Sequence, residues 1–148
     1  MNHNVQGSHR PSIYRVLRQT ADRVQLLVDA SLAPTALTMP HLLFLEHLIR
    51  TDEGVSLGQM AQALGCGRSN ITQLADRLER LGLIAREPDR IDRRSIQAVV
   101  TAEGRKRYPG GAAALSSVEQ HLRRKMSAGG ARRLVKSLDD LTDAMHNA

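Results

Sequence analysis

A row of polar residues in the middle of the chain has the side-chain types that can read base edges in a nucleic acid. Asparagine and glutamine pair with adenine, arginine pairs with guanine, and serine or threonine can bond to a base or a phosphate. Helical spacing puts these residues on the solvent face of one expected helix: Arg68, Ser69, Asn70, Thr72, Gln73 and Arg77. Such a face can also be merely solvated, so the neighbouring sequence has to decide between the two interpretations.

A second basic group lies in the polar segment Pro88–Arg94, which contains Arg90, Arg93 and Arg94. Arginine side chains in such a turn can reach phosphates or enter a narrow minor groove. Residues 55–109 hold ten basic and six acidic residues, a net charge of +4 within a chain total of +6. The charge surplus therefore coincides with the polar row, which favours contact with a polyanion.

The elements that must position these residues are mostly helices. Apolar residues at helical spacing predict a helix over about residues 13–32, which ends at Ala33-Pro34 because proline disfavours helical geometry in the residue before it. A second helix is expected to follow Thr38 as its N-cap, with Pro40 in its first turn. This helix is apolar almost all round, which predicts a central position in the fold.

The next segment has the pattern of a helix-turn-helix. Ser56 and Gln59 form a capping box that opens a short helix, and Gly65-Cys66-Gly67 makes a tight turn. A further helix is predicted from about Arg68 to Leu81, with Gly82 at the position that favours a left-handed cap. Two helices joined by a short glycine turn are typical of DNA-binding helix-turn-helix units.

The hydrophobic period changes after this unit. Leu83–Glu87 and Ile96–Val100 are strand-like and predict a β-hairpin around the arginine-rich turn. Thr101 can cap a following helix, and two amphipathic stretches complete the chain. The expected fold is mainly α-helical with a small β-hairpin wing, a winged helix-turn-helix flanked by N- and C-terminal helices.

The run from Leu64 to Ile84 resembles the recognition-helix block of MarR-type transcriptional regulators. Asp92-Arg93-Arg94 and Val100–Gly104 are similar to that family's wing and its strand-to-helix junction, and Leu37–Pro40 resembles the entry to its second helix. The resemblance covers residues 12–146 and implies a homodimer that binds double-stranded DNA at a pseudo-palindromic operator. It also implies a repressor that a small molecule releases. Separately, no oxyanion hole or orienting partner is recognisable for a nucleophile that pairs Cys66 with a histidine, so we expect no enzymatic activity.

The resemblance further implies roles for particular segments. Residues 12–148 would form one domain after a disordered segment 1–11, with dimerisation helices over 12–36 and 105–148 and the winged module over 37–104. Asp92 would brace the wing arginines by an ion pair, and Arg94 matches the family's wing arginine. One departure is Gly67, which stands where a capping side chain is usual and offers no hydroxyl to a phosphate.

An effector pocket for a small anionic aromatic molecule is a further implication. The first two helices carry candidate lining residues, which are Tyr14, Arg15, Met39, His41 and Phe44. The alternative is that these residues are ordinary core and surface positions.

Other kinds of site have little support in the sequence. Cys66 precedes a helix, where a thiol can be activated, but we expect it to pack the turn into the core as a small apolar residue. The six histidines form no i, i+4 pair, so a zinc site would have to assemble across a dimer. We therefore expect no cofactor and no metal.

Composition limits the remaining classes. No apolar run approaches the ~20 residues of a membrane span, and no secretion signal is recognisable, so we expect a cytoplasmic protein. The chain has two Tyr, one Phe and no Trp, too few to stack single strands. The rival interpretation is a winged-helix architectural or RNA-associated protein that binds by charge without reading sequence.

Overall fold

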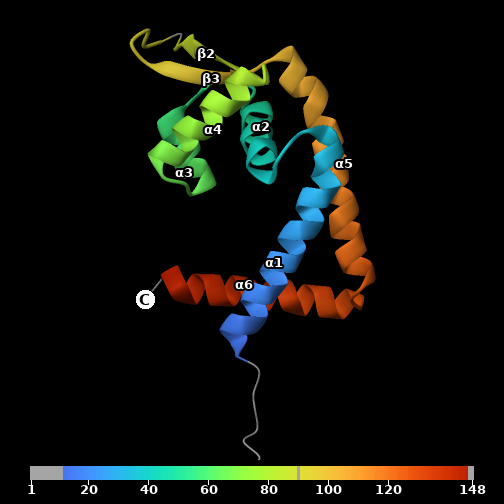
Figure 1. The fold of residues 1–148 in the computed structure, drawn as a ribbon. Coiled ribbons are helices and arrows are strands. Elements are labelled where there is room, and N and C mark those ends of the chain that lie inside the picture. Colours follow the sequence, from blue (N-terminus) through green and yellow to red (C-terminus); the bar gives the residue numbers. More distant parts are fainter. Residues whose placement is uncertain (1–11, 90, 147–148) are drawn as a thin grey trace, which may run out of the picture.

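Helices carry most of the structure, a computed structural model that describes residues 12–89 and 91–146. The helices are α1 (Ile13–Leu32), α2 (Met39–Thr51), α3 (Leu57–Leu64), α4 (Arg68–Arg80), α5 (Ala102–Arg124) and α6 (Ala128–His146), with a 3₁₀ turn η1 (Ala33–Thr35). The strands are β1 (Val55–Ser56), β2 (Ile84–Pro88) and β3 (Ile96–Val100). Figure 1 shows a head of α2–α4 and the sheet, joined by α1 and α5 to α6 at the far end. The predicted fold class is confirmed.

Side-chain caps start the helices where the sequence predicts. The Thr38 hydroxyl accepts a hydrogen bond from a backbone N–H of α2, and Ser56 and Gln59 exchange the two bonds of a capping box at 3.2 and 3.0 Å. The Thr101 hydroxyl accepts from the N–H of Gly104 at 3.0 Å. Each cap satisfies N–H groups that the first helical turn leaves without a partner.

The sheet has three strands in the order β1-β3-β2, all antiparallel. β2 and β3 form the predicted hairpin, with Ile84 opposite Val100. β1 was not predicted, because two residues are too short to show an alternating pattern; it is defined by pairing between Val55 and Ala98, far apart in the sequence. The extra strand fixes the wing to the segment between α2 and α3.

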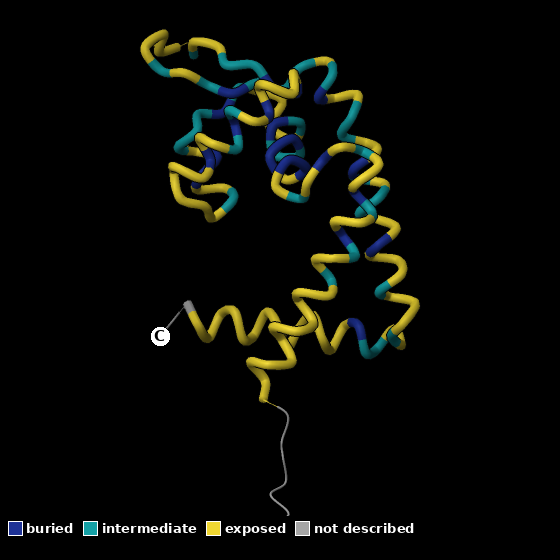
Figure 2. Tube along the Cα trace, viewed as in Figure 1, coloured by how far each residue is buried: buried dark blue, intermediate teal, exposed yellow. Residues whose placement is uncertain are grey.

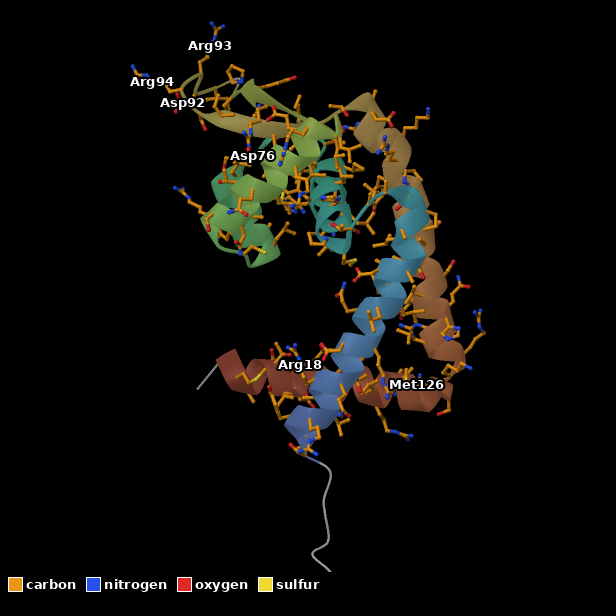
Figure 3. All side chains as sticks on the ribbon, in the orientation of Figure 1. Arg18, Asp76, Asp92, Arg93, Arg94 and Met126 are labelled. Atoms are coloured by element: carbon orange, nitrogen blue, oxygen red, sulfur yellow. The ribbon has the colours of Figure 1, made fainter. Side chains whose placement is uncertain are left out.

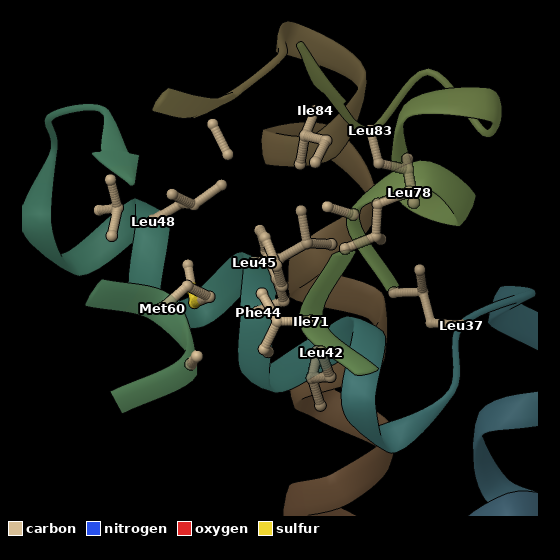
Figure 4. Close-up of a cluster of buried hydrophobic side chains, with 14 of the residues drawn as sticks. Leu37, Leu42, Phe44, Leu45, Leu48, Met60, Ile71, Leu78, Leu83 and Ile84 are labelled. Atoms are coloured by element: carbon tan, nitrogen blue, oxygen red, sulfur yellow. The ribbon is translucent and has the colours of Figure 1, made fainter. Parts of the chain in front are cut away.

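The core lies between α2, α3, α4 and the sheet (Figure 4). Phe44 and Leu45 of α2 are fully buried, and Ile71 and Leu78 of α4 pack in the same cluster. The burial of α2 on several sides confirms its predicted central position. The buried face of α4 therefore holds the opposite, polar face of this helix toward solvent.

Cys66 is exposed, so the expectation that it packs the turn into the core is wrong. Gly65 adopts a left-handed conformation (φ +62°) at the end of α3 and redirects the chain there. Met60 and Ile71, both buried, belong to the core that α3 and α4 share. The Cys66 thiol instead donates a hydrogen bond to the carbonyl oxygen of Leu64 at 3.4 Å.

Most residues of the segment farthest from the head are exposed (Figure 2), and several of them are apolar. Ile13 and Tyr14 at the start of α1 are 73% and 78% exposed. On α6 the residues that follow a 3–4–3–4 spacing are Ala131, Leu134, Leu138, Leu141 and Met145, and all except Ala131 are exposed. The second half of α1, by contrast, reaches the core through Val28 and Leu32.

Candidate nucleic-acid interface

The polar row predicted from the sequence lies on the exposed face of α4. All six residues are exposed: Arg68, Ser69, Asn70, Thr72, Gln73 and Arg77. The structure thus brings them together on one surface. The Thr72 hydroxyl is partly engaged, because it donates a hydrogen bond to the carbonyl oxygen of Arg68 at 2.9 Å.

Arg68 differs from the rest of the row in its surroundings. A Cβ built on Gly58 would lie 3.2 Å from Nη2 of Arg68, so the guanidinium lies over the first turn of α3. Gly67 is the N-cap of α4 and makes no side-chain hydrogen bond to the first turn, consistent with the departure noted in the sequence. The positive charge of Arg68 is therefore close to the starts of both helices of the helix-turn-helix.

The tip of the wing is organised by Asp89. Its Oδ1 accepts hydrogen bonds from the backbone N–H groups of Ile91 at 2.7 Å and Asp92 at 3.0 Å. The hydrogen bond from Asp92, and then the one from Ile91, lower the pKa of the half-buried Asp89 carboxyl, because they stabilise its charged form. The role of Asp89 was missed in the sequence, although aspartate at the start of a turn is a recognised signal for this contact.

Arg93 and Arg94 point outward from the wing tip (Figure 3). The expected ion pair between Asp92 and these two arginines is absent from the described residues. The Asp92 carboxylate instead accepts from the backbone N–H of Arg94 at 3.1 Å, which leaves both guanidinium groups exposed. Arg90 lies outside the described residues.

An ion-pair cluster joins the wing to α4. Nη2 of Arg86 in β2 lies 2.5 Å from Oδ1 of Asp76, and its Nη1 lies 3.5 Å from Oε2 of Glu79. The Arg86 side chain is 28% exposed, and its Nε is buried without a hydrogen-bond partner. Arg86 was not predicted as a site residue, because its pairing with α4 depends on strand geometry rather than on local spacing.

The residues expected to line an effector pocket are divided between two places. Tyr14 and Arg15 are exposed near the start of α1, and Phe44 is fully buried in the core. Arg15 is 17 residues from the end of α1, about 26 Å along the helix, so these residues do not meet within one chain. A hollow of about 460 Å³ lies elsewhere, between the end of α2, the wing and the start of α5.

His41 is buried at the start of α2. Its Nδ1 accepts a hydrogen bond from the N–H of Thr38 at 3.2 Å, and its Nε2 has no partner. Burial, with a smaller contribution from the charge of Arg77, lowers the pKa of His41 below 6.5. His41 therefore completes the cap of α2 as a neutral side chain.

Within residues 12–89 and 91–146, no group of three or more His, Cys, Asp or Glu side chains is placed to hold a metal ion. No single helix in these ranges is long and apolar enough to cross a membrane, and only the bent pair of α1–η1 and α2 meets that test by length and composition.

An exposed polar helix beside a basic β-hairpin defines the winged helix-turn-helix class. The model of the MarR family matches residues 37–95, which is the segment from the start of α2 through the wing. Over this segment the chain is similar to the MarR family of transcriptional regulators, and its fold is a winged helix-turn-helix.

Solved structures of MarR-type fold cover almost the whole chain. CouR from Rhodococcus jostii RHA1, bound to p-coumaroyl-CoA, is 25% identical with a TM-score of 0.74, over 88% of this chain and 91% of that one. MepR from S. aureus, in a complex with DNA, is 21% identical with a TM-score of 0.82, over 90% and 98%. BpsR from Bordetella bronchiseptica is a protein whose DNA binding is regulated by 6-hydroxynicotinic acid. It is 18% identical with a TM-score of 0.78, over 97% of this chain and 98% of that one. No match was found among curated proteins.

Proposed function

We propose that the protein is a sequence-specific transcriptional regulator that binds double-stranded DNA as a homodimer. The observation that carries this proposal is the exposed polar face of α4 next to the outward Arg93 and Arg94 of the wing. A major groove is wide enough for an α-helix, and Ser69, Asn70 and Gln73 can bond to base edges there. The wing arginines would contact phosphates or the minor groove beside it.

The homodimer is supported by the apolar surfaces far from the head. The first turns of α1 and the 3–4–3–4 stripe of α6 expose large apolar side chains, among them Ile13, Leu138 and Met145. A contiguous apolar face of this kind usually marks a protein interface. A second copy would cover both surfaces in an isologous contact, and would separate the two α4 helices by one turn of DNA, about 34–36 Å.

A selection of genomic DNA fragments by the purified protein tests the proposal. At ~150 mM salt, where weak charge contacts are screened, a shared two-fold site is expected. Asn70→Ala or Gln73→Ala should weaken binding to that site by about 1–3 kcal/mol without weakening binding to random duplex. Arg94→Gln should weaken binding to all duplexes and lower the slope of log affinity against log salt by about 1.

A charge-only binder is the second candidate function. Its support is the net charge of +6, which attracts any polyanion. Recovered fragments without a common sequence, and a specific-to-random affinity ratio far below ~10³, would favour this candidate. The base-reading roles of Ser69, Asn70 and Gln73 would then be withdrawn.

We also propose that the regulator is a repressor released by a small anionic aromatic molecule. The support comes from CouR and BpsR, whose structures involve p-coumaroyl-CoA and 6-hydroxynicotinic acid. Because Tyr14 and Arg15 are far from Met39 and His41 in one chain, a pocket made of these residues requires a second copy. The rise in Tm on adding salicylate-like acids checks this proposal. An equal rise in the wild type and in Arg15→Ala would exclude Arg15 from the effector pocket.

A further inference from the structure

Asp76 places a carboxylate on the side of α4 that faces outward with the base-reading residues. It follows Ser69 by seven residues and Gln73 by three, which puts all three side chains on one helix face. Glu79 lies three residues beyond Asp76, and the two side chains are 47% and 41% exposed. Figure 3 shows Asp76 on α4 below the wing.

Two carboxylates on this face oppose DNA binding. Phosphate groups carry the negative charge of the duplex, and an exposed Asp or Glu near them is repelled. The structure places one cation against both acids, since the two terminal nitrogens of Arg86 contact Asp76 and Glu79 separately. Arg86 is held in that position by β2, where it is paired opposite Ala98 of β3.

We propose that Arg86 is a positioning residue for DNA binding, which acts by neutralising Asp76 and Glu79 on the recognition helix. The inference rests on the proposed DNA-binding function. A direct phosphate contact is a less suitable role, because both ends of the guanidinium are occupied by carboxylates and its Nε is buried. Among the described residues, the exposed arginines at the wing tip, Arg93 and Arg94, are better placed to meet phosphates.

A set of charge variants tests this role through DNA affinity. Arg86→Gln leaves two negative charges uncompensated, and its affinity for a duplex is expected to fall at least ~10-fold. The triple variant Arg86→Gln, Asp76→Asn, Glu79→Gln has no charge in the cluster and should recover to within ~3-fold of wild type. Arg86→Lys keeps the positive charge and should also bind within ~3-fold.

Salt dependence separates neutralisation from phosphate contact. A lost phosphate contact lowers the slope of log affinity against log salt by about 0.9, whereas Arg86→Gln should keep the wild-type slope. Arg18→Gln is the matched control, because it also loses one charge from an ion pair, with Asp22, but lies on α1 far from the wing (Figure 3). Its affinity should remain close to wild type.

Three results would overturn the role of Arg86. The first is wild-type DNA affinity in Arg86→Gln, and the second is an equal loss of DNA affinity in Arg86→Gln, Arg86→Lys and the triple variant. The third is a reduced slope of log affinity against log salt in Arg86→Gln. An equal loss of DNA affinity would identify a purely structural role for Arg86, and the melting temperatures of the same variants would then be lowered. A wild-type protein that selects no shared site would refute sequence-specific function instead. The comparison on a random duplex still decides the role of Arg86 in that case, since repulsion from phosphates does not depend on sequence.

Discussion

Gly104 and Gly110 lie in the same helix, α5, yet alanine at the two positions is expected to change stability in opposite directions. A Cβ on Gly104 would overlap the carbonyl oxygen of Leu83, well inside 3.0 Å, and would lie 2.9 Å from Cγ2 of Val100. The overlapping atom belongs to the backbone and accepts a hydrogen bond from the N–H of Thr101 at 3.1 Å, so it cannot move aside freely. The start of α5 would have to move away from the junction of α4 and β2.

The magnitude for Gly104→Ala follows from three contributions. Overpacking of this kind costs about 1–3 kcal/mol, and weakening the Leu83–Thr101 hydrogen bond adds about 1 kcal/mol. The higher helix propensity of alanine than of glycine adds about 1 kcal/mol to the free energy of unfolding. The net loss is about 1–3 kcal/mol, which lowers Tm by roughly 3–9 °C for a domain of this size.

Gly110→Ala is the matched control. A Cβ there would meet only Cγ2 of Thr35 at 3.8 Å, an ordinary contact, and the position is exposed. The helix preference of alanine then acts alone, and stability should rise by about 0.5–1 kcal/mol. Thermal and urea unfolding followed by circular dichroism, at one protomer concentration, measure both variants. Equal Tm values for Gly104→Ala and Gly110→Ala would refute the steric reasoning.

Three further predictions concern titration, the wing and a cap. The pKa of His41 is lowered in the folded protein, so the unfolded chain binds the His41 proton more tightly, and the free energy of unfolding should fall as the pH drops below about 6.5. The urea midpoints at about pH 5.5 and about pH 7.5 should differ less in His41→Gln than in the wild type, because glutamine keeps a capping side chain but does not titrate. Asp89→Ala should speed amide exchange at Ile91 and reduce DNA affinity with little change in Tm, whereas unchanged exchange would contradict its role in the turn. Thr101→Val removes both the cap and the 2.7 Å hydrogen bond to Gly82, and should cost about 1–2 kcal/mol of unfolding free energy; Thr101→Ser should cost much less.

Local signals explain why the elements could be predicted. Thr38, Ser56 and Thr101 each cap a helix through contacts within three residues, and Gly82 ends the α4 segment with a φ of +70°. Contacts of this range are encoded in short sequence patterns. The exposed row on α4 follows from the same helical periodicity that buries its opposite face.

The parts that could not be predicted depend on contacts between distant residues. β1 exists because Val55 pairs with Ala98, and the ion pair between Arg86 and Asp76 requires the hairpin to return beside α4. Cys66 was assigned to the core from its residue type, whereas the left-handed Gly65 sets the direction of the chain. Neither a strand pairing nor the direction of a turn residue is visible in helical or alternating periodicity.

The attachment of α5 to the head has a mechanical consequence. Thr101 donates a hydrogen bond to Leu83 through its N–H and to Gly82 through its hydroxyl, so the residue before α5 is held to the junction between α4 and β2. The 23 residues of α5 then extend about 35 Å toward α6. If α5 tilts by 5° about the end next to α6, its other end moves by about 3 Å together with the head. That is about the length of one hydrogen bond, so a small rotation between the far helices is enough to move a side chain off a base edge.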